Sequence, residues 1–440
     1  MQGDVGKPLL LPDGVVFTCQ NSGACCRNDW LIGVDEASHA ALRDVDWTLH
    51  DPAIGSGPKF TPLPFALPSG ERLTFARKPC GECVFLTVDT RCAIHAHLGY
   101  REKPQVCREF PYSFVETPDG VAVGVSFACT AVRAHHGRPL AEQEAEVRGV
   151  VAGSRRIRRL PDPIPLYGRL DVTWGEYKAI EAAWLDLLAR ADVPVPLALV
   201  AGSVLVTLAV GLKRAEALAA EGGSEPGETL SGGLAALARE RHARLVAIAA
   251  NARYPKRPSL TYLAPLYTWL DFSQRRMSRL ALVAMLYANF LKFRRGRGAV
   301  RDVTGGGSAA IERVQQIAFV TDGELEGFLR EYWGHVLVRK TLTPLHGVFR
   351  GYQTVLALYG FTKWVARLHA ARAGRTRVDL ADLKEAVRLL EQRLILHARY
   401  IDLFDVSPFL TALADRLYRR PAFVRAAVLE PGGEDLPAPC

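Results

Sequence analysis

The sequence predicts an α+β protein that is predominantly α, in which a small irregular cysteine-cluster domain is followed by an all-α helical domain. Two observations lead to this prediction. Eight of the nine cysteines lie between Cys19 and Cys129, in a region rich in proline and glycine. Beyond residue 160, apolar residues recur with the spacing of helix faces. At 440 residues the chain is long enough for two domains, which we place at residues 10–150 and 160–440.

The first region contains few long periodic segments. We expect short strands at Trp30–Val34 and Val121–Phe127, because β-branched and aromatic residues are frequent in both runs. Residues 117–120 read Thr-Pro-Asp-Gly, with Pro second and Gly fourth, which is typical of a type I turn leading into the second strand. We infer that something other than regular secondary structure organises this region.

Three residues in the second region are expected to cap the N-termini of helices. Thr173 and Thr321 each precede a glutamate by three residues, which is the pattern of a capping box. Asp379 precedes a long amphipathic segment and is expected to cap it. Residues 221–233 and 303–308 are rich in glycine and predict loops.

Residues 193–212 contain no charged side chain and reach the length of a membrane span. Pro194 and Pro196 stand at the start of this segment, and the chain has no second apolar run of that length. We therefore interpret the segment as a helix buried in the core of the helical domain, and we expect no membrane partner. The first residues lack the apolar run of a secretory signal, so we expect a cytoplasmic protein with reduced thiols.

The formal net charge is +9, a mild bias that would attract an acidic partner. Arginine-rich sequences often carry such a charge, and we expect no nucleic-acid partner. The basic run at residues 292–301 is interpreted as a solvated loop. The sequence does not indicate an oligomeric state.

The clustered cysteines carry the functional prediction. Thiolates are soft ligands that suit zinc, copper(I) and iron–sulfur clusters. Disulfides would require an oxidising compartment, and eight thiols exceed what nucleophilic catalysis needs. Eight thiols suffice for two sites of four ligands, or for one site with four spare cysteines. We expect metal ligands among Cys19, Cys25, Cys26, Cys80, Cys83, Cys92, Cys107 and Cys129.

Three neighbouring features refine this prediction. The two-residue gap between Cys80 and Cys83 lets both sulfurs face one metal across a tight turn. His95 follows Cys92 closely and is a candidate for an additional ligand. Arg108 follows Cys107 directly, and a cation beside thiolates favours their charged, metal-binding form.

Five motifs in this order resemble the YkgJ-type cysteine-cluster family, described as zinc- or iron-chelating and often as iron–sulfur proteins. They are F-x-C-x5-C-C at 17–26, C-x-F-L at 83–86, C-x-I-H at 92–95, K-P-x-x-C-R-x-F-P at 103–111 and S-F-x-C at 126–129. The resemblance implies that seven of the cysteines are family positions, whereas Cys80 is added on its chemistry alone. It favours an iron–sulfur cluster or iron as the cofactor, with zinc as the alternative.

The run from Cys25 to Asp35 is also similar to the C-C-x-x-W-x-I-x-V/I-D run of flagellin lysine N-methylases, although three residues separate Cys26 from Trp30 here. This similarity implies an alternative function. The chain would be a protein-lysine N-methylase that uses S-adenosylmethionine, acts on a protein substrate and includes the cluster domain in its catalytic unit. The sequence contains neither a glycine-rich loop after a strand nor a C-x3-C-x2-C motif, so we predict no catalytic residue. A third alternative is a helical partner-binding scaffold stapled by structural zinc.

Overall fold

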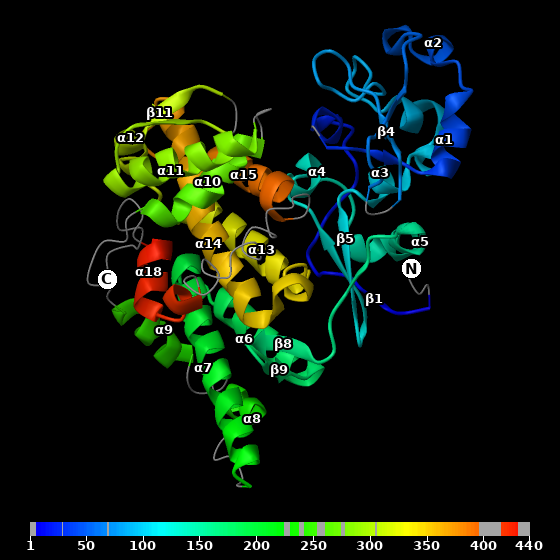
Figure 1. Ribbon diagram of the computed structural model, residues 1–440. Helices are drawn as coiled ribbons and strands as arrows, with labels where there is room; N and C mark the ends of the chain where they lie inside the picture. The colour runs from blue at the N-terminus through cyan, green and yellow to red at the C-terminus, as the bar shows by residue number, and fades with distance from the viewer. Residues whose placement is uncertain are drawn as a thin grey trace. The chain divides into compact units, whose positions relative to one another are not determined.

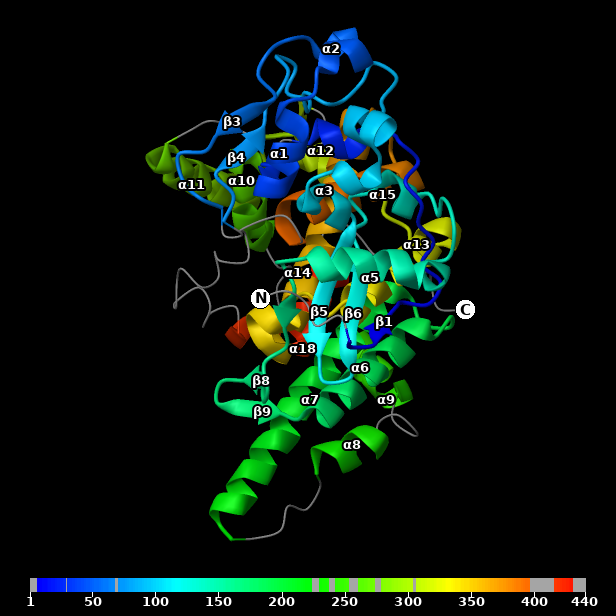
Figure 2. The same cartoon turned by 90° about the vertical axis from the view of Figure 1, so that its right-hand side faces the viewer.

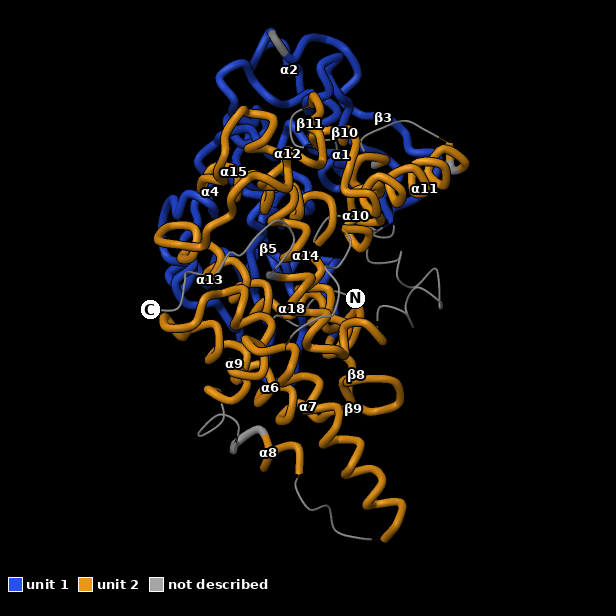
Figure 3. The backbone as a smooth tube through the Cα atoms, turned by 90° about the vertical axis from the view of Figure 1, so that its left-hand side faces the viewer, with its two compact units in different colours: residues 1–159 blue, residues 160–440 orange. Residues whose placement is uncertain are grey.

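The structure is a computed structural model of residues 1–440. It describes residues 6–28, 30–67, 70–223, 229–236, 242–252, 260–273, 278–303, 306–395 and 415–429. Helices make up 58% of the chain and strands 12%, which confirms the predicted α+β class with a predominance of helices. The chain divides into two compact units, residues 1–159 and 160–440 (Figure 3).

Unit 1 consists of short elements joined by long loops (Figure 1). Its strands are β1 (Leu9–Leu10), β2 (Gly33–Val34), β3 (Phe60–Pro62), β4 (Leu73–Phe75), β5 (Tyr112–Thr117), β6 (Gly120–Val125) and β7 (Arg158–Arg159). Its helices are α1 (Glu36–Arg43), α2 (Trp47–His50), α3 (Gln105–Glu109), α4 (Thr130–Arg133) and α5 (Glu144–Gly153). Single helical turns are η1 (Ala24–Arg27), η2 (Pro52–Ile54), η3 (Ile94–Leu98), η4 (Tyr100–Glu102) and η5 (Leu140–Gln143).

Two small sheets organise the strands of unit 1. The first has the order β1-β6-β5-β7, in which β5 and β6 form an antiparallel hairpin and the outer strands pair in parallel. Helix α5 lies beside this hairpin in both views (Figures 1 and 2). The expected turn closes the hairpin, with Thr117 opposite Gly120, and β6 overlaps the predicted strand Val121–Phe127 at residues 121–125. The second sheet has the antiparallel order β2-β4-β3.

The strand expected at Trp30–Val34 is shorter than predicted, because only β2 at its end is paired as a strand. The carbonyl of Trp30 accepts a hydrogen bond from the guanidinium of Arg77 instead of from a neighbouring strand. A side chain therefore takes the place of a backbone partner at the start of this segment.

In the described part of unit 2, the regular elements are helices and two short hairpins. Its helices are α6 (Trp174–Ala189), α7 (Val195–Glu221), α8 (Leu230–Ala236), α9 (His242–Asn251), α10 (Ala264–Ser273), α11 (Arg279–Arg295), α12 (Ile311–Gln315), α13 (Gly323–Val338), α14 (Thr343–Arg372), α15 (Leu380–Leu390) and α18 (Pro421–Leu429), with the turns η7 (Leu260–Leu263) and η8 (Glu391–Ile395). The hairpins are β8–β9 (Ile164–Tyr167 and Leu170–Val172) and β10–β11 (Ala299–Arg301 and Ser308–Ala310). The all-α prediction for this domain omitted them, because each strand has only three or four residues.

Helix α14 is the central element of unit 2 and packs against α7, α15 and α18 (Figure 1). It consists of two helical segments that meet at Gly347, where φ is 69°. A Cβ atom at that position would lie 2.4 Å from the carbonyl oxygen of Pro165, so only glycine fits the turn against β8.

The apolar segment at residues 193–212 forms most of α7. This helix is long and apolar enough to cross a membrane, but 72% of its most apolar window is buried inside the protein. It packs against α6, α9 and α18. Its burial agrees with the interpretation of the segment as a core helix.

Of the three residues predicted to cap helices, Thr173 and Asp379 do so and Thr321 does not. Thr173 caps α6 in a capping box with Glu176, and Asp379 caps α15 in a second box with Asp382. The box predicted at Thr321 is wrong, because α13 starts after Asp322 without a capping hydrogen bond from a side chain. The carboxylate of Asp322 instead accepts hydrogen bonds from Arg377, 2.8 Å from both oxygens.

The loop predictions were only partly right. Residues 221–233 include the end of α7 and the start of α8, and residues 224–228 lie outside the described part of the chain. Residues 304–305 of the second predicted loop also lie outside it. The basic run at residues 292–301 is not a continuous loop, because it contains the last turn of α11 and the strand β10.

Candidate metal centre

Two of the predicted ligands, Cys25 and Cys26, lie in the single turn η1. Their sulfur atoms are 4.0 Å apart. The turn begins at Gly23, whose φ of 66° and close neighbours exclude a side chain. A Cβ atom there would lie 2.8 Å from both Leu86 Cδ1 and the Thr90 carbonyl oxygen. Glycine at this position therefore lets the paired cysteines approach the loop that contains Cys83 and Cys92.

Backbone hydrogen bonds join this turn to the other cysteine segments. The amide of Cys83 donates to the carbonyl of Cys26 over 2.8 Å, and Leu86 forms an isolated β-bridge with Cys92. Cys107 lies in the short helix α3, where its amide donates to the carbonyl of Pro104 over 2.8 Å. Four segments that are distant in sequence thus contribute cysteines to one region of unit 1.

These cysteines pack against one hydrophobic core. Cys83 is buried in a cluster that includes Trp47, Phe75 and Phe85. Three more cysteines are partly buried and pack against the same cluster, namely Cys26, Cys92 and Cys107. The apolar surroundings restrict water around the sulfurs, which favours neutral thiols over thiolates when no metal is bound.

The pKa values of these thiols show this effect. The neighbouring thiol of Cys26, followed by burial, raises the pKa of Cys25 well above its usual value. The pKa of Cys26 is raised as well, because the thiol of Cys83 and burial together outweigh the lowering effect of its hydrogen bond with Cys25. Burial also raises the pKa of Cys92, and it raises that of Cys107 to about 12. Cys25 and Cys92 each raise the pKa of Cys107 further, so the groups interact electrostatically.

Lys103 is the cation among these sulfurs, and the sequence analysis did not single it out. Burial alone would lower the pKa of its amine, but the negative charges available on Cys107, Cys92 and Cys25 raise it above the usual value. Its Nζ also lies 5.4 Å from the centroid of the Tyr100 ring. Lys103 lies four residues before Cys107 and belongs to the motif at residues 103–111, but the motif alone does not indicate that its amine faces the sulfurs.

Arg77 organises the backbone around the same cysteines, and no sequence pattern indicates this role. Its Nη1 donates to the carbonyl of Gly81 over 3.1 Å, and it contacts the carbonyl of Cys26 at 3.5 Å. The guanidinium also donates to the carbonyls of Asn28 and Trp30. One side chain thereby contacts a carbonyl within the turn that contains Cys26, two carbonyls after that turn and one in the loop before Cys83.

Cys129 and Cys19 lie near one another at the edge of this group. Cys129 precedes α4, and burial raises its pKa to about 11, although the amides of Val132 and Ala131 lower it. Both Cys25 and Cys19 raise the pKa of Cys129, which places the three thiols within electrostatic reach of each other. Cys19 is exposed, and its thiol lies 3.7 Å from Asn21 Oδ1.

Cys80 is exposed at the turn of residues 78–81, and none of the thiol–thiol interactions found among the described residues involves it. His95 is partly exposed with its ring 5.7 Å from that of Tyr100, and burial followed by the charge of Lys103 lowers its pKa. Its neutral imidazole remains able to bind a metal.

The contacts found for Arg108 are with Tyr100, and its expected role beside the Cys107 thiolate stays a prediction. Its carbonyl accepts a hydrogen bond from the Tyr100 hydroxyl over 2.7 Å, and its positive charge lowers the pKa of Tyr100. The cations that lower the pKa of Cys107 are Lys103 and Arg156. Successive residues of a helix point in different directions, so the neighbour in sequence need not be the neighbour in space.

The cysteine side chains of this region are ligands of the kind that soft metals prefer. The described cysteines are all free thiols. A Zn–S bond of about 2.3 Å in a tetrahedral site implies sulfurs about 3.8 Å apart, and the sulfurs of Cys25 and Cys26 are 4.0 Å apart. Within the described ranges, no three or more His, Cys, Asp or Glu side chains are arranged as a complete metal site. Binding would therefore require the remaining thiols to turn towards this pair.

A scan against protein-family models found no match for this chain, and searches of the curated proteins and of the solved structures found none either. The two resemblances drawn from the sequence motifs therefore stay predictions.

Proposed function

We propose that unit 1 binds an iron–sulfur cluster or a metal ion through cysteine thiolates. The observation that carries this proposal is the convergence of thiols from four segments on one core. The ligands would come from Cys25, Cys26, Cys83, Cys92 and Cys107. Cys19 and Cys129 would supply further ligands or shield the edge of the centre.

The electrostatics support a bound cationic centre over a set of free thiols. Burial keeps the thiols neutral in the absence of metal, so the protein alone does not hold them as thiolates. A bound metal deprotonates its thiol ligands and leaves the site with a net negative charge. Lys103 and Arg156 would then face thiolates, whose negative charge would compensate the half-buried ammonium group of Lys103.

The type of metal follows from the ligands and from the sequence resemblance. An all-sulfur donor set suits iron–sulfur clusters and zinc, and the resemblance favours iron. A bound cluster would supply electron transfer or a structural link, whereas zinc would supply the structural link alone. Both require reduced thiols, and we accordingly propose that the protein acts in the cytoplasm.

A set of single serine substitutions tests the proposal. Cys26→Ser and Cys107→Ser each remove a sulfur from the converging group, and we expect both to lose most of the bound metal. Cys80→Ser is the matched control, because it removes an exposed thiol of the same unit that is absent from the thiol–thiol interactions found among the described residues. Metal and acid-labile sulfide are measured on protein purified without oxygen. Full metal content in Cys26→Ser and Cys107→Ser would contradict the ligand assignment, as would wild-type protein without metal.

The protein-lysine N-methylase and the zinc-stapled scaffold remain the alternatives. Methyl transfer from S-adenosylmethionine to a lysine-bearing protein such as flagellin would support the first. Colourless protein with stoichiometric zinc would support the second, because zinc has a full d shell and iron–sulfur clusters are brown.

A further inference from the structure

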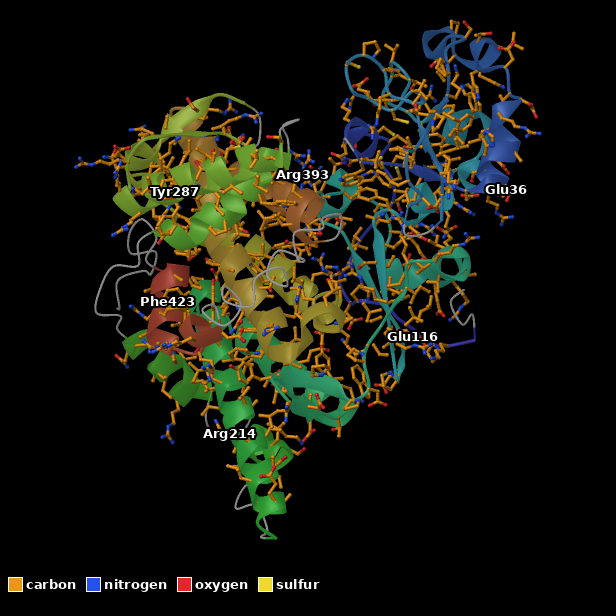
Figure 4. The ribbon with its side chains drawn as sticks, in the orientation of Figure 1. Glu36, Glu116, Arg214, Tyr287, Arg393 and Phe423 are labelled. Carbon is orange, nitrogen blue, oxygen red and sulfur yellow. The ribbon has the colours of Figure 1, made fainter. Side chains whose placement is uncertain are left out.

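Helix α11 exposes a continuous apolar stripe. The exposed fractions are 83% for Leu280, 66% for Val283 and 66% for Tyr287. Leu286 and Phe290 are exposed by 38% and 41%. Leu280, Val283 and Tyr287 have the i, i+3, i+7 spacing of a single helix face, and Figure 4 labels Tyr287 on this helix. We call these five residues the α11 stripe.

The stripe departs from the usual amphipathic arrangement. A surface helix normally turns its apolar face to the core and its polar face to water. In α11 the inward face buries Phe293 against Tyr267 and Trp364. It also buries Asn289, which donates a hydrogen bond to Thr268 Oγ1 over 3.0 Å. The helix is therefore apolar on its exposed face as well as on its buried face. The helix packs against α10 and η7, so the stripe is not needed to attach it to unit 2. Exposed apolar residues grouped in this way indicate a surface that binds something.

Positive charge accompanies the stripe. From residue 275 to residue 301 the sequence contains eight arginines and lysines and no aspartate or glutamate. Arg294, Arg295 and Arg297 are exposed at the C-terminal end of α11. Arg294 follows Tyr287 by seven residues, which places it on the same face as the stripe. The partner should therefore offer an apolar region bordered by negative charge.

The charge distribution disfavours a second copy of this chain as that partner. Two α11 helices packed face to face would bring two acid-free basic segments together, and like charges would repel. A bilayer with anionic headgroups satisfies both requirements, since it accepts apolar side chains at the headgroup boundary and attracts arginine. At about 1.5 Å per residue, 17 residues form a straight ridge of about 25 Å, which suits a flat surface.

We propose that the α11 stripe binds the surface of an anionic membrane, with α11 lying in the plane of the headgroups. Leu280, Val283 and Tyr287 would enter the headgroup boundary, and the exposed arginines would contact lipid phosphates. This is a peripheral contact and requires no spanning helix. It departs from the expectation of no membrane partner, which was drawn from the apolar run at residues 193–212 and not from α11. It is independent of the proposed metal site.

Vesicle flotation with the full-length protein tests this proposal. The vesicles contain phosphatidylcholine alone or phosphatidylcholine with phosphatidylglycerol. We expect binding only to the anionic vesicles, and we expect it to weaken as salt is added. The double variant Leu280→Ser/Tyr287→Ser should lower binding by about tenfold or more. Arg294→Gln/Arg295→Gln should lower it by about fivefold for each arginine removed.

Two exposed apolar residues elsewhere provide matched controls. Leu218→Ser on α7 and Val88→Ser in unit 1 remove side chains that are 59% and 85% exposed, and both should bind like the wild type. Circular dichroism confirms that each variant is folded. The proposal fails if the wild type does not float with anionic vesicles, or if the α11 variants bind as well as the controls. It also fails if the wild type forms a dimer that the α11 variants abolish, since the stripe would then bind a second copy.

Discussion

The two units of this chain are stabilised in different ways. In unit 2, long helices bury apolar faces against one another, and α14 alone contributes Tyr352, Phe361 and Trp364 to the core. In unit 1 the longest strands have six residues and the longest helix has ten, within the described ranges. Its loops are held by the guanidinium of Arg77 and by a group of half-buried thiols. The comparison teaches that unit 2 depends on side-chain packing, whereas unit 1 combines a small apolar core with a group of thiols, and we propose that its stability depends on what those thiols bind.

Buried charge illustrates the same contrast. In unit 2 Arg339 and Glu391 are fully buried and form an ion pair at 2.7 Å, with the hydroxyl of Tyr332 donating to Glu391 over 2.9 Å. This pair is complete within the polypeptide. In unit 1 Lys103 faces Cys25, Cys92 and Cys107, which carry compensating charge only as thiolates. Unit 2 should therefore be insensitive to metal and unit 1 strongly dependent on it.

Removal of the metal is expected to have the largest effect. Metal binding and folding are coupled in thiolate sites, and structural zinc contributes about 10–16 kcal/mol in small domains. We expect a chelator to unfold unit 1 while the helices of unit 2 stay folded. Hydrogen exchange followed by mass spectrometry measures protection in each unit separately. Equal loss of protection in both units, or in neither, would remove the distinction drawn between them.

The pH dependence of metal binding should be the next largest effect after removal of the metal. The pKa values of Cys25, Cys26, Cys92 and Cys107 are all raised, so below about pH 8.5 each of these four thiols carries a proton that the metal must displace. The apparent affinity should rise about tenfold per pH unit for each proton displaced. Competition with a chelator between pH 6 and pH 8 measures the slope.

The free energy of unfolding of unit 1 without its metal, which we expect to be low, should change with pH in the opposite direction. A thiol whose pKa is higher in the folded state contributes stability below its unfolded pKa of about 8.5, and this contribution is lost as the pH rises. This contribution is gone above the folded pKa values, which are about 12 for Cys107 and about 11 for Cys129.

In the chelator competition, a metal affinity that does not change with pH would show that these thiols are not the ligands.

Arg339→Met should produce the largest effect in unit 2. It leaves the carboxylate of Glu391 buried without its partner, which costs about 3–5 kcal/mol of unfolding free energy. The double variant Arg339→Met/Glu391→Leu should recover most of that loss, because no unpaired charge remains. Denaturant unfolding measures both variants. Metal content should not change in either, and a loss of metal would argue against the separation of the two units.

Arg77→Met is expected to weaken unit 1 by about 2–3 kcal/mol, because several carbonyls around Cys26 lose a charged donor. Metal retention at a limiting chelator concentration is the more specific measurement and should fall. Arg91→Met is the matched control, since its ion pair with Asp89 is exposed and should contribute about 1 kcal/mol or less. Indistinguishable results for Arg77→Met and Arg91→Met would mean that Arg77 does not position the cysteine turn.

The smallest effect concerns the helix starts of unit 2. Thr173→Ala removes the capping box of α6 and should cost about 1 kcal/mol. Thr321→Ala at the other Thr-x-x-Glu sequence should cost much less, because α13 has no capping hydrogen bond there. Thermal unfolding compares the two. A loss at Thr321 as large as that at Thr173 would contradict the capping assignments.

The features that could be predicted from the sequence are those formed by residues close together in the chain. The capping boxes at Thr173 and Asp379 and the turn at residues 117–120 involve residues within four positions of one another. The same local pattern failed at Thr321, because the carboxylate of Asp322 binds Arg377, which is distant in sequence. Local rules hold only where no remote group competes for the same atoms.

The surroundings of the cysteines depended on such remote contacts. Spacing and residue type were enough to single out Cys25, Cys26 and Cys107 as candidate ligands. The charges around Cys107 could not be predicted from spacing. They come from Lys103, four residues before it, and from Arg156, 49 residues after it. The role of Arg77 consists of contacts to loop carbonyls, which every residue possesses and which therefore leave no pattern in the sequence.

X-ray absorption at the metal edge of anaerobically purified protein tests the central claim most directly. The account predicts stoichiometric metal whose nearest neighbours are sulfur atoms at about 2.3 Å, with sulfur scattering reduced in Cys107→Ser and unchanged in Cys80→Ser. A first shell of oxygen and nitrogen alone, or protein that purifies without metal, would contradict it.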